Sequence, residues 1–349
     1  MDDRFECKNK WWRDIELMKA YIKAISYYLP ERIVTNEDLV KEFPEWSVDK
    51  IAKKIGVNER HVSAEGETAG DMGIRAAEKL FDEHGIDKSC IDFVLLCSQS
   101  PDYFLPSTAC VIQDKLGLST KCGAFDFNLG CSGYEYGLAV AKGLITAEVA
   151  KNILLLTAET YNKHIHPKDK GNRTIFGDAA AATLVSTDGF AEIGNFNLGT
   201  DGSGYDKLIH KTGGMRHYER MNDLHYNEDG IPISSDHLFM DGKAIFDFTS
   251  DIVPPMIEET LAKNQMKMED IDLFVFHQAN KYMINFLRKM LEIEKDKFYV
   301  FMENVGNTVS STIPIALYEA QKEGKLRGNI LLAGFGVGLS YGATIIHCQ

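Results

Sequence analysis

The chain has 349 residues, 44% of them hydrophobic, and a formal net charge of −13. The length is enough for one large core or two coupled ones, the negative charge argues against general nucleic-acid binding, and no apolar run is long enough to span a membrane. The seven cysteines are an odd number without zinc-type or CxxC spacing, which favours a reducing cytoplasm and predicts neither a disulfide framework nor a metal site.

Residues 1–17 lack the strand-like alternation that begins near residue 19, and we interpret them as a flexible N-terminal extension. The sequence pattern of residues 20–29 predicts a strand that ends at Pro30. An amphipathic helix is predicted over 76–84 and a buried strand over 91–96. A short apolar strand over 125–127 then leads through a glycine turn to Cys131, which opens a predicted helix.

Three segments recur in the same order later in the chain. Residues 271–276 resemble 91–96 at an offset of 180 (271 − 91), and 329–333 resemble 152–156 at 177 (329 − 152). The Asn-x-Gly frame before Cys131 recurs before Asn307 at an offset of 176 (307 − 131). Apolar strands separated by helices indicate sheets covered on both faces. We therefore predict an α/β fold of two duplicated halves, residues 18–187 and 188–349.

Chemically competent side chains follow strands in both halves. Carboxyl ends of strands are where open α/β sheets place ligands. A cysteine at a helix N-terminus is favoured as thiolate, so Cys131 is a candidate nucleophile, and the alternative is a buried structural cysteine. His277 follows the buried strand 274–276 directly. Asn307 is a second polar candidate, and the alternative is that it only caps the next helix.

The run from Gly334 to Gly342 has four glycines in nine residues. Such a run lets backbone N–H groups approach a reacting atom closely. It lacks the lysine of a phosphate-binding loop. Beside a nucleophilic cysteine, an oxyanion hole is the better interpretation.

Together these motifs resemble the thiolase superfamily, and in particular the β-ketoacyl-acyl-carrier-protein synthase III family. The resemblance runs from about Met18 to Cys348. It is carried by Asn-Leu-Gly-Cys131-Ser-Gly, His277-Gln-Ala-Asn280, Gly306-Asn307-Thr308 and the terminal glycine run. It implies a five-layered αβαβα fold and a cytoplasmic homodimer.

The resemblance also implies a reaction, an acyltransfer that forms a carbon–carbon bond. Cys131 is acylated by an acyl thioester, commonly acyl-CoA. Malonyl-acyl carrier protein then decarboxylates while His277 and Asn307 donate hydrogen bonds to the thioester oxygen, and the carbanion attacks the acyl group. The backbone N–H groups of Cys131 and Val337 would form the oxyanion hole. No cofactor is implied beyond the CoA and phosphopantetheine thioesters that are substrates, and the 3-ketoacyl product starts fatty-acid or related chain synthesis.

Other positions that match the family imply a substrate channel and a docking surface. Lys170 stands where arginine is usual, which weakens stacking on CoA and leaves a protein-bound first acyl donor as an alternative. Leu105 stands where some relatives close the acyl pocket across the dimer with phenylalanine, so we expect room for a longer or branched acyl group. Carrier docking is expected at Lys281, Arg288 and Lys289. The expected substrate-binding residues are Trp46, Leu105, Lys170, Gly171, Gly242, Phe246, Ala279 and Asn280.

Three other functions compete with this interpretation. An acyltransferase of the same fold would move the acyl group without extending the carbon chain. A hydroxymethylglutaryl-CoA synthase would need a catalytic carboxylate, for which Glu159 is the nearest candidate. A non-catalytic subunit of a synthase would have no need of Cys131, His277 and Asn307 together.

Overall fold

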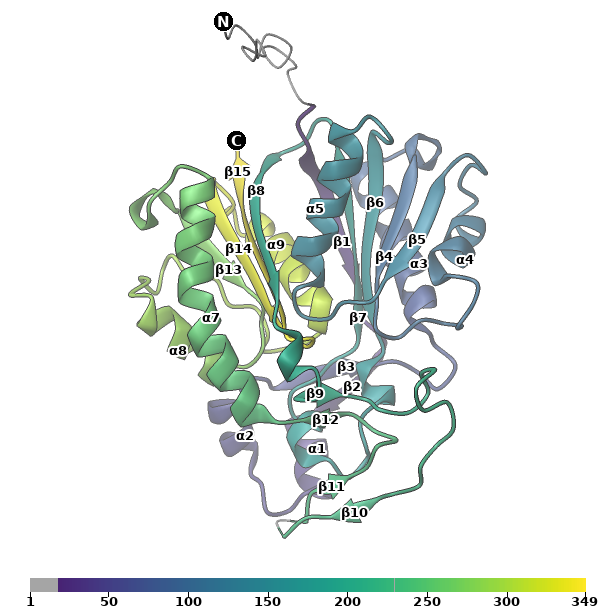
Figure 1. The fold of residues 1–349 in the computed structure, drawn as a ribbon, viewed down its shortest axis with the longest axis vertical. Coiled ribbons are helices and arrows are strands. Elements are labelled where there is room, and N and C mark those ends of the chain that lie inside the picture. The colour runs from purple at the N-terminus through teal and green to yellow at the C-terminus, as the bar shows by residue number, and fades with distance from the viewer. Residues whose placement is uncertain (1–17, 229) are drawn as a thin grey trace, which may run out of the picture.

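The computed structural model describes residues 18–228 and 230–349, so the predicted N-terminal extension lies outside the described residues. A nine-stranded sheet forms the centre, in the order β13-β14-β15-β8-β1-β7-β6-β4-β5 (Figure 1). The two halves meet where β1 pairs with β8 at Tyr21 and Ile22. The first half contributes β1 (Tyr21–Tyr28), β4 (Phe93–Cys97), β5 (Gly123–Phe127), β6 (Asn152–Glu159) and β7 (Ala179–Ser186). The second contributes β8 (Ala191–Thr200), β13 (Leu273–Phe276), β14 (Gly328–Gly336) and β15 (Ser340–Cys348).

Helices cover this sheet in the expected layers. Two central helices, α5 (Gly133–Thr146) and α9 (Thr312–Lys322), pack between the half-sheets, and α5 contacts strands of both (Figure 1). The outer face of the first half is covered by α3 (Ala69–His84) and α4 (Thr108–Lys115). The outer face of the second half is covered by α7 (Gly242–Lys263), with α8 (Lys281–Met290) beside it. The order is thus helix, sheet, helix, sheet, helix.

The predicted duplication is visible in the elements, with one difference. The helix α3 and strand β4 correspond to α7 and β13, and β6 corresponds to β14. The counterpart of β5 is not a regular strand, because residues 300–303 have no strand pairing and only an isolated bridge joins Phe274 to Phe298. The predicted boundary between residues 187 and 188 falls in the connection from β7 to β8.

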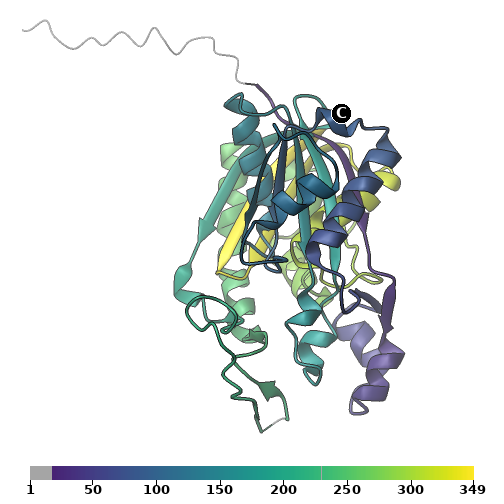
Figure 2. The same ribbon diagram turned by 90° about the vertical axis from the view of Figure 1, so that its right-hand side faces the viewer.

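Smaller elements gather at one end of the molecule (Figures 1 and 2). No helix among the described residues is long and apolar enough to cross a bilayer. The segments at this end are β2 (Arg32–Thr35), α1 (Asn36–Glu42), α2 (Val48–Lys54), β3 (Glu59–Val62), α6 (Lys170–Arg173), β9 (Leu208–Ile209), β10 (His225–Tyr226), β11 (Pro232–Ile233) and β12 (Phe239–Met240).

Candidate active site

Cys131 lies between β5 and the first turn of α5, and its exposed fraction is 7%. The hairpin of β14 and β15 packs directly onto it. A methyl group on Gly336 would lie 2.9 Å from the Cys131 sulfur, and one on Gly334 would lie 2.6 Å from its carbonyl oxygen. Only glycine permits this approach, as the glycine-rich run predicted.

Two backbone N–H groups act on the Cys131 thiol. They belong to Val337 and to Cys131 itself, and both lower the pKa of the thiol. The family resemblance implies these two N–H groups as the donors of an oxyanion hole. Convergent backbone donors stabilise negative charge that develops on a reacting oxygen.

The electrostatic state of Cys131 differs from the expected thiolate. Burial raises its pKa to about 12, although the N–H of Val337 acts in the opposite direction. The nearby Glu159 and Glu135 carboxyls raise the pKa further. Removal of water penalises the charged form more than the helix N-terminus favours it. The resting side chain is therefore a neutral thiol.

His277 directly follows β13 and is buried. Its Nδ1 lies 2.8 Å from the Thr312 hydroxyl oxygen, and that hydroxyl donates to the Val309 carbonyl at 3.0 Å. Burial lowers the pKa of His277 to about 3, although the Val309 carbonyl acts to raise it. The imidazole is thus neutral at physiological pH.

The Asn307 side chain is buried and hydrogen-bonded through both its oxygen and its nitrogen. Its Oδ1 accepts a hydrogen bond of 2.9 Å from the Val309 N–H, at the start of a short 3-10 helix over Val309–Ser311. This bond turns Nδ2 toward His277 Nε2, 3.5 Å away, and toward the Ala279 carbonyl, 3.3 Å away. The hydrogen bond from the Val309 N–H therefore orients the Asn307 amide nitrogen toward His277.

The residues predicted at the substrate entrance lie together, with contacts of their own. Lys170 Nζ lies 2.9 Å from Oε1 of Glu45, the residue that precedes Trp46. The Trp46 ring is covered by the Lys50 ammonium at 5.0 Å from its centroid. Gly171 is exposed in α6.

Other predicted substrate residues are more dispersed. Phe246 stacks on Phe286 with ring centroids 4.8 Å apart, and Gly242 is exposed at the start of α7. Asn280 caps α8 by accepting from the Met283 N–H at 2.9 Å. Leu105 is 83% exposed and does not line the site of its own chain.

A cavity of about 250 Å³ beside Val337 has a lining that sequence reasoning missed. The same strand-end rule that selected His277 could have found three of its residues, since Gln99, Asn128 and Tyr161 follow β4, β5 and β6 closely. The cavity is lined by Gln99, Asn128, Tyr161, His164, Leu208, Ile209, His210, Leu238 and Val337.

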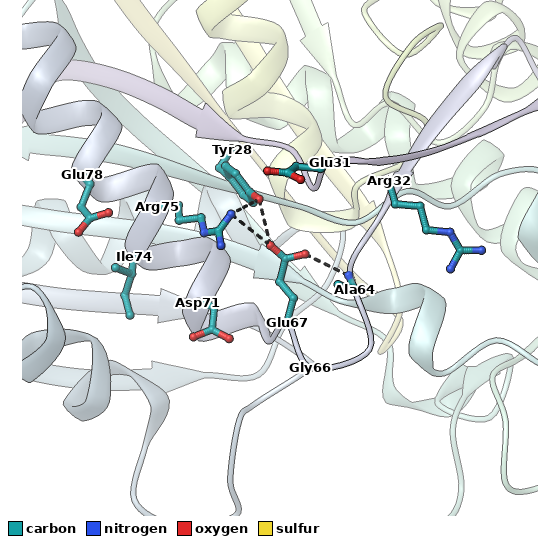
Figure 3. A pocket seen from close by; sticks show the side chains of 10 residues that line it. All are labelled: Tyr28, Glu31, Arg32, Ala64, Gly66, Glu67, Asp71, Ile74, Arg75 and Glu78. Carbon is teal, nitrogen blue, oxygen red and sulfur yellow. Dashed lines mark hydrogen bonds and ion pairs between the residues drawn. The ribbon is translucent and has the colours of Figure 1, made fainter.

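A larger cavity of about 920 Å³ lies elsewhere, along α3, and contains none of the predicted site residues (Figure 3). Glu67 accepts hydrogen bonds there from the Tyr28 hydroxyl at 3.0 Å and from the Ala64 N–H at 3.1 Å. Arg75 donates to the same hydroxyl at 2.6 Å. Its central polar groups are paired with one another, so size alone does not mark the reactive site.

Glu159, the carboxylate considered for a hydroxymethylglutaryl-CoA synthase, is fully buried. It accepts hydrogen bonds from the Gln99 N–H at 2.8 Å and from the Ser100 hydroxyl at 2.9 Å. Burial raises its pKa to about 8. Both carboxyl oxygens of Glu159 thus accept hydrogen bonds from the segment that follows β4.

Comparisons with known proteins identify the family of the chain. The profile described as 3-oxoacyl-[acyl-carrier-protein (ACP)] synthase III matches residues 125–202, and that of its C-terminal part matches residues 261–348. A β-ketoacyl-[acyl-carrier-protein] synthase III of Clostridium perfringens is 38% identical over 95% of this chain and 99% of its own length.

Solved structures give the same result. A crystal structure of a 3-oxoacyl-(acyl-carrier-protein) synthase III is 44% identical, with a TM-score of 0.92, over 94% of this chain and 99% of the other. A 3-oxoacyl-(acyl-carrier protein) synthase from Burkholderia xenovorans LB400 is 34% identical, with a TM-score of 0.86, over 95% of this chain and 94% of the other. The chain therefore has the thiolase-like fold and belongs to the β-ketoacyl-[acyl-carrier-protein] synthase III family of acyltransferases.

Proposed function

We propose that the chain condenses an acyl group held on Cys131 with malonyl-acyl carrier protein, releasing CO₂ and a 3-ketoacyl thioester that starts fatty-acid or related synthesis. One observation carries this proposal. The Asn307 amide is oriented by the Val309 N–H so that a neutral donor lies beside His277 Nε2. Decarboxylation needs stabilised negative charge on an oxygen, and neutral donors in a buried site supply it.

The first half-reaction requires a proton acceptor, because Cys131 rests as a thiol. Thr312 donates to the Val309 carbonyl, so its oxygen accepts from His277 Nδ1–H and leaves Nε2 unprotonated. Nε2 then takes the thiol proton as sulfur attacks the acyl thioester. The carbon–sulfur bond of the donor breaks, and the leaving thiolate recovers that proton.

The second half-reaction requires His277 as a donor. The bond between the malonyl carboxylate and its neighbouring carbon breaks, and the electron pair moves onto the thioester oxygen. Before this step the imidazole exchanges tautomer with water, which takes the proton of Nδ1 and gives one to Nε2. The Thr312 hydroxyl then rotates to donate to Nδ1, and the Nε2–H lies beside the Asn307 amide. The enolate carbon then attacks the acyl-Cys131 carbonyl, and the sulfur leaves as a thiolate that takes up one proton from water to restore the thiol. Thr312 acts as a positioning residue that allows both tautomers.

The competing functions fit the geometry less well. A simple acyltransferase has no use for the oriented Asn307 amide beside His277. A hydroxymethylglutaryl-CoA synthase needs a carboxylate that reaches substrate, whereas Glu159 is buried and engaged by Gln99 and Ser100. A non-catalytic subunit does not need the approach of Gly336 to the Cys131 sulfur.

The contacts at the substrate entrance indicate which kind of acyl donor the chain uses. The positive charge of Lys170 is paired with Glu45, and the Trp46 face is occupied by Lys50. A CoA nucleotide would have to displace both contacts. This arrangement supports a weakly bound CoA thioester or a protein-bound donor as the first substrate.

A second copy of the chain would cover an exposed apolar loop. Tyr103, Phe104 and Leu105 are 59%, 67% and 83% exposed, and the Phe104 ring lies 6.0 Å from that of Tyr218, which is 66% exposed. Contiguous exposed apolar groups mark interaction surfaces. We infer a homodimer formed through this loop, with Leu105 contributed to the partner.

The surface for the acidic carrier protein is the basic groove, defined by Lys53, Lys54, Lys281 and Lys289 around Tyr282, Asn285 and Phe286. Two of its lysines come from α2, whose end joins the start of α8 through the Lys281 N–H and the Ile55 carbonyl. Arg288 is less suitable than expected, because its guanidinium donates to the Ile293 carbonyl at 2.8 Å. Local positive charge can dock an acidic partner on a protein of net negative charge.

The proposed reaction is tested by intact-mass spectrometry with acyl-CoA or acyl-carrier donors, followed by malonyl-acyl carrier protein. The wild type should gain the acyl mass and then lose it with release of CO₂ and a 3-ketoacyl carrier. Cys131→Ala should gain no mass. Asn307→Ala should become acylated but condense about 100-fold more slowly, since one donor is lost. Acyl transfer without CO₂ release would support the simple acyltransferase instead.

The neutral thiol predicts a pH dependence. Because burial raises the pKa of Cys131 to about 12, its thiolate fraction should grow about tenfold per pH unit between about pH 7 and pH 9. Alkylation by iodoacetamide, followed at Cys131 by peptide mapping, should rise accordingly without levelling. A plateau within that range would show a thiolate already formed, as the sequence alone had suggested.

Thr312→Val should affect the two half-reactions unequally. Valine cannot donate to Nδ1, so the imidazole hydrogen stays on Nδ1 and the Nε2 donor is lost. Condensation should fall about 100-fold, while acylation of Cys131 falls much less. Thr312→Ser should restore condensation, since serine keeps the hydroxyl. Equal losses in both half-reactions for Thr312→Val would contradict the tautomer role.

Charge reversal in the basic groove should weaken carrier recognition. The Lys53→Glu, Lys54→Glu double variant should raise the KM for malonyl-acyl carrier protein about tenfold at low salt, with less effect at high salt. Acylation by a small thioester should be unaffected. The matched control is Lys121→Glu, Lys151→Glu, at exposed positions preceding β5 and β6. Equal behaviour of the two double variants would rule out this surface.

A further inference from the structure

We propose that the cavity beside Val337 binds the acyl group and selects one that carries a neutral hydrogen-bonding group, such as a hydroxyl, over a plain alkyl chain. The inference rests on the proposed function, since it names the substrate class of the same site. Five of the nine lining residues are polar, namely Gln99, Asn128, Tyr161, His164 and His210. A pocket for a plain alkyl chain would be lined by apolar groups.

The cavity lies beside the turn that carries the reacting sulfur, although Cys131 does not itself line it. Gly130, the residue before Cys131, lies between the Gln99 amide and the Val337 side chain. A methyl group on Gly130 would lie 2.7 Å from Gln99 Oε1 and 2.5 Å from Val337 Cγ1. Val337 supplies one of the two N–H groups that lower the pKa of the Cys131 thiol. An acyl group on Cys131 that extends past Val337 therefore meets Gln99 first.

The near wall offers hydrogen-bond donors. The Tyr161 hydroxyl donates to Gln99 Oε1 at 2.9 Å, and Gln99 Nε2 donates to Asn128 Oδ1 at 3.1 Å. These bonds fix both amides and leave one N–H of Gln99 available, and no hydrogen bond among the described residues uses the Asn128 nitrogen. An alkyl chain would remove water from these groups without replacing its hydrogen bonds.

The far wall is polar but uncharged. His164 Nε2 lies 3.3 Å from the Ser100 hydroxyl, which donates to Glu159, and His164 Nδ1 lies 3.0 Å from His210 Nδ1. Burial lowers the pKa of His164 to about 4 and also lowers that of His210. No lysine or arginine among the described residues lines the cavity. A carboxylate on the acyl group would therefore lack a cation.

The volume limits the length of the acyl group. A water molecule occupies roughly 30 Å³ of liquid, so about 250 Å³ equals the space of about eight waters. A short acyl chain with one polar substituent fits this space, and a long chain does not.

The test compares CoA thioesters of matched length: butyryl, 3-hydroxybutyryl and the anionic succinyl. Acylation of Cys131 is timed by intact-mass spectrometry in single turnovers. The wild type should react with 3-hydroxybutyryl-CoA about tenfold faster than with butyryl-CoA, the range of one neutral hydrogen bond. Succinyl-CoA should be the slowest.

Two pocket variants and one control complete the test. Gln99→Met keeps the length of the side chain but removes the amide, and should bring the ratio of hydroxybutyryl to butyryl rates toward one. Asn128→Leu, at an exposed position with little risk to folding, should do the same. Gln321→Met, at an exposed position in α9, should leave the wild-type ratio unchanged.

The outcomes separate the two proposals. Equal rates for the butyryl and hydroxybutyryl thioesters in the wild type would overturn the polar-pocket inference while leaving the proposed condensation intact. A preference for succinyl-CoA would overturn the uncharged character of the pocket. Absence of Cys131 acylation by every CoA thioester, and by the same acyl groups carried on acyl carrier protein, would overturn the proposed function and this inference with it.

Discussion

The approach of Gly336 to the Cys131 sulfur is the contact on which the rest of the site depends. It joins the β14–β15 hairpin of the second half to the start of α5 in the first half. A methyl group at Gly336 would lie 2.9 Å from Sγ and force the halves apart. Because Gly336 has no side chain to intervene, the Val337 N–H can act on the sulfur and lowers the pKa of the thiol. The two halves therefore build one reaction centre only where glycine allows backbone and sulfur to meet.

This close packing makes the site electrically neutral. The burial that excludes water raises the pKa of Cys131 to about 12, lowers that of His277 to about 3 and raises that of Glu159 to about 8. At neutral pH none of the three is charged. The site therefore acts through oriented neutral hydrogen-bond donors and not through charged groups. The Val309 N–H orients the amide of Asn307, and the Thr312 hydroxyl sets which nitrogen of the His277 ring carries the hydrogen.

Much of the fold and of the candidate site could be predicted from the sequence, because helices, strands and turns depend mainly on residues that are close together in the chain. Helical and apolar periodicity indicated the two halves, and the position of side chains after strands selected Cys131 and His277. The expectation of a thiolate was wrong because it considered only the helix that begins after Cys131. Gly336 of β14 lies some 200 residues later in the chain (336 − 131 = 205) and packs on Cys131. The burial that results raises the pKa of the thiol more than the helix N-terminus lowers it.

The sequence by itself determined the family, the duplicated α/β fold and the identity of the three candidate catalytic residues, because these depend on motifs and on periodicity along the chain. Only the tertiary structure decided the rest: the protonation states, the orientation of Asn307, the pairing of Lys170 with Glu45 and the polar cavity of Gln99 and His164. The physical reason is that solvent exclusion and hydrogen-bond direction depend on which distant segments pack together.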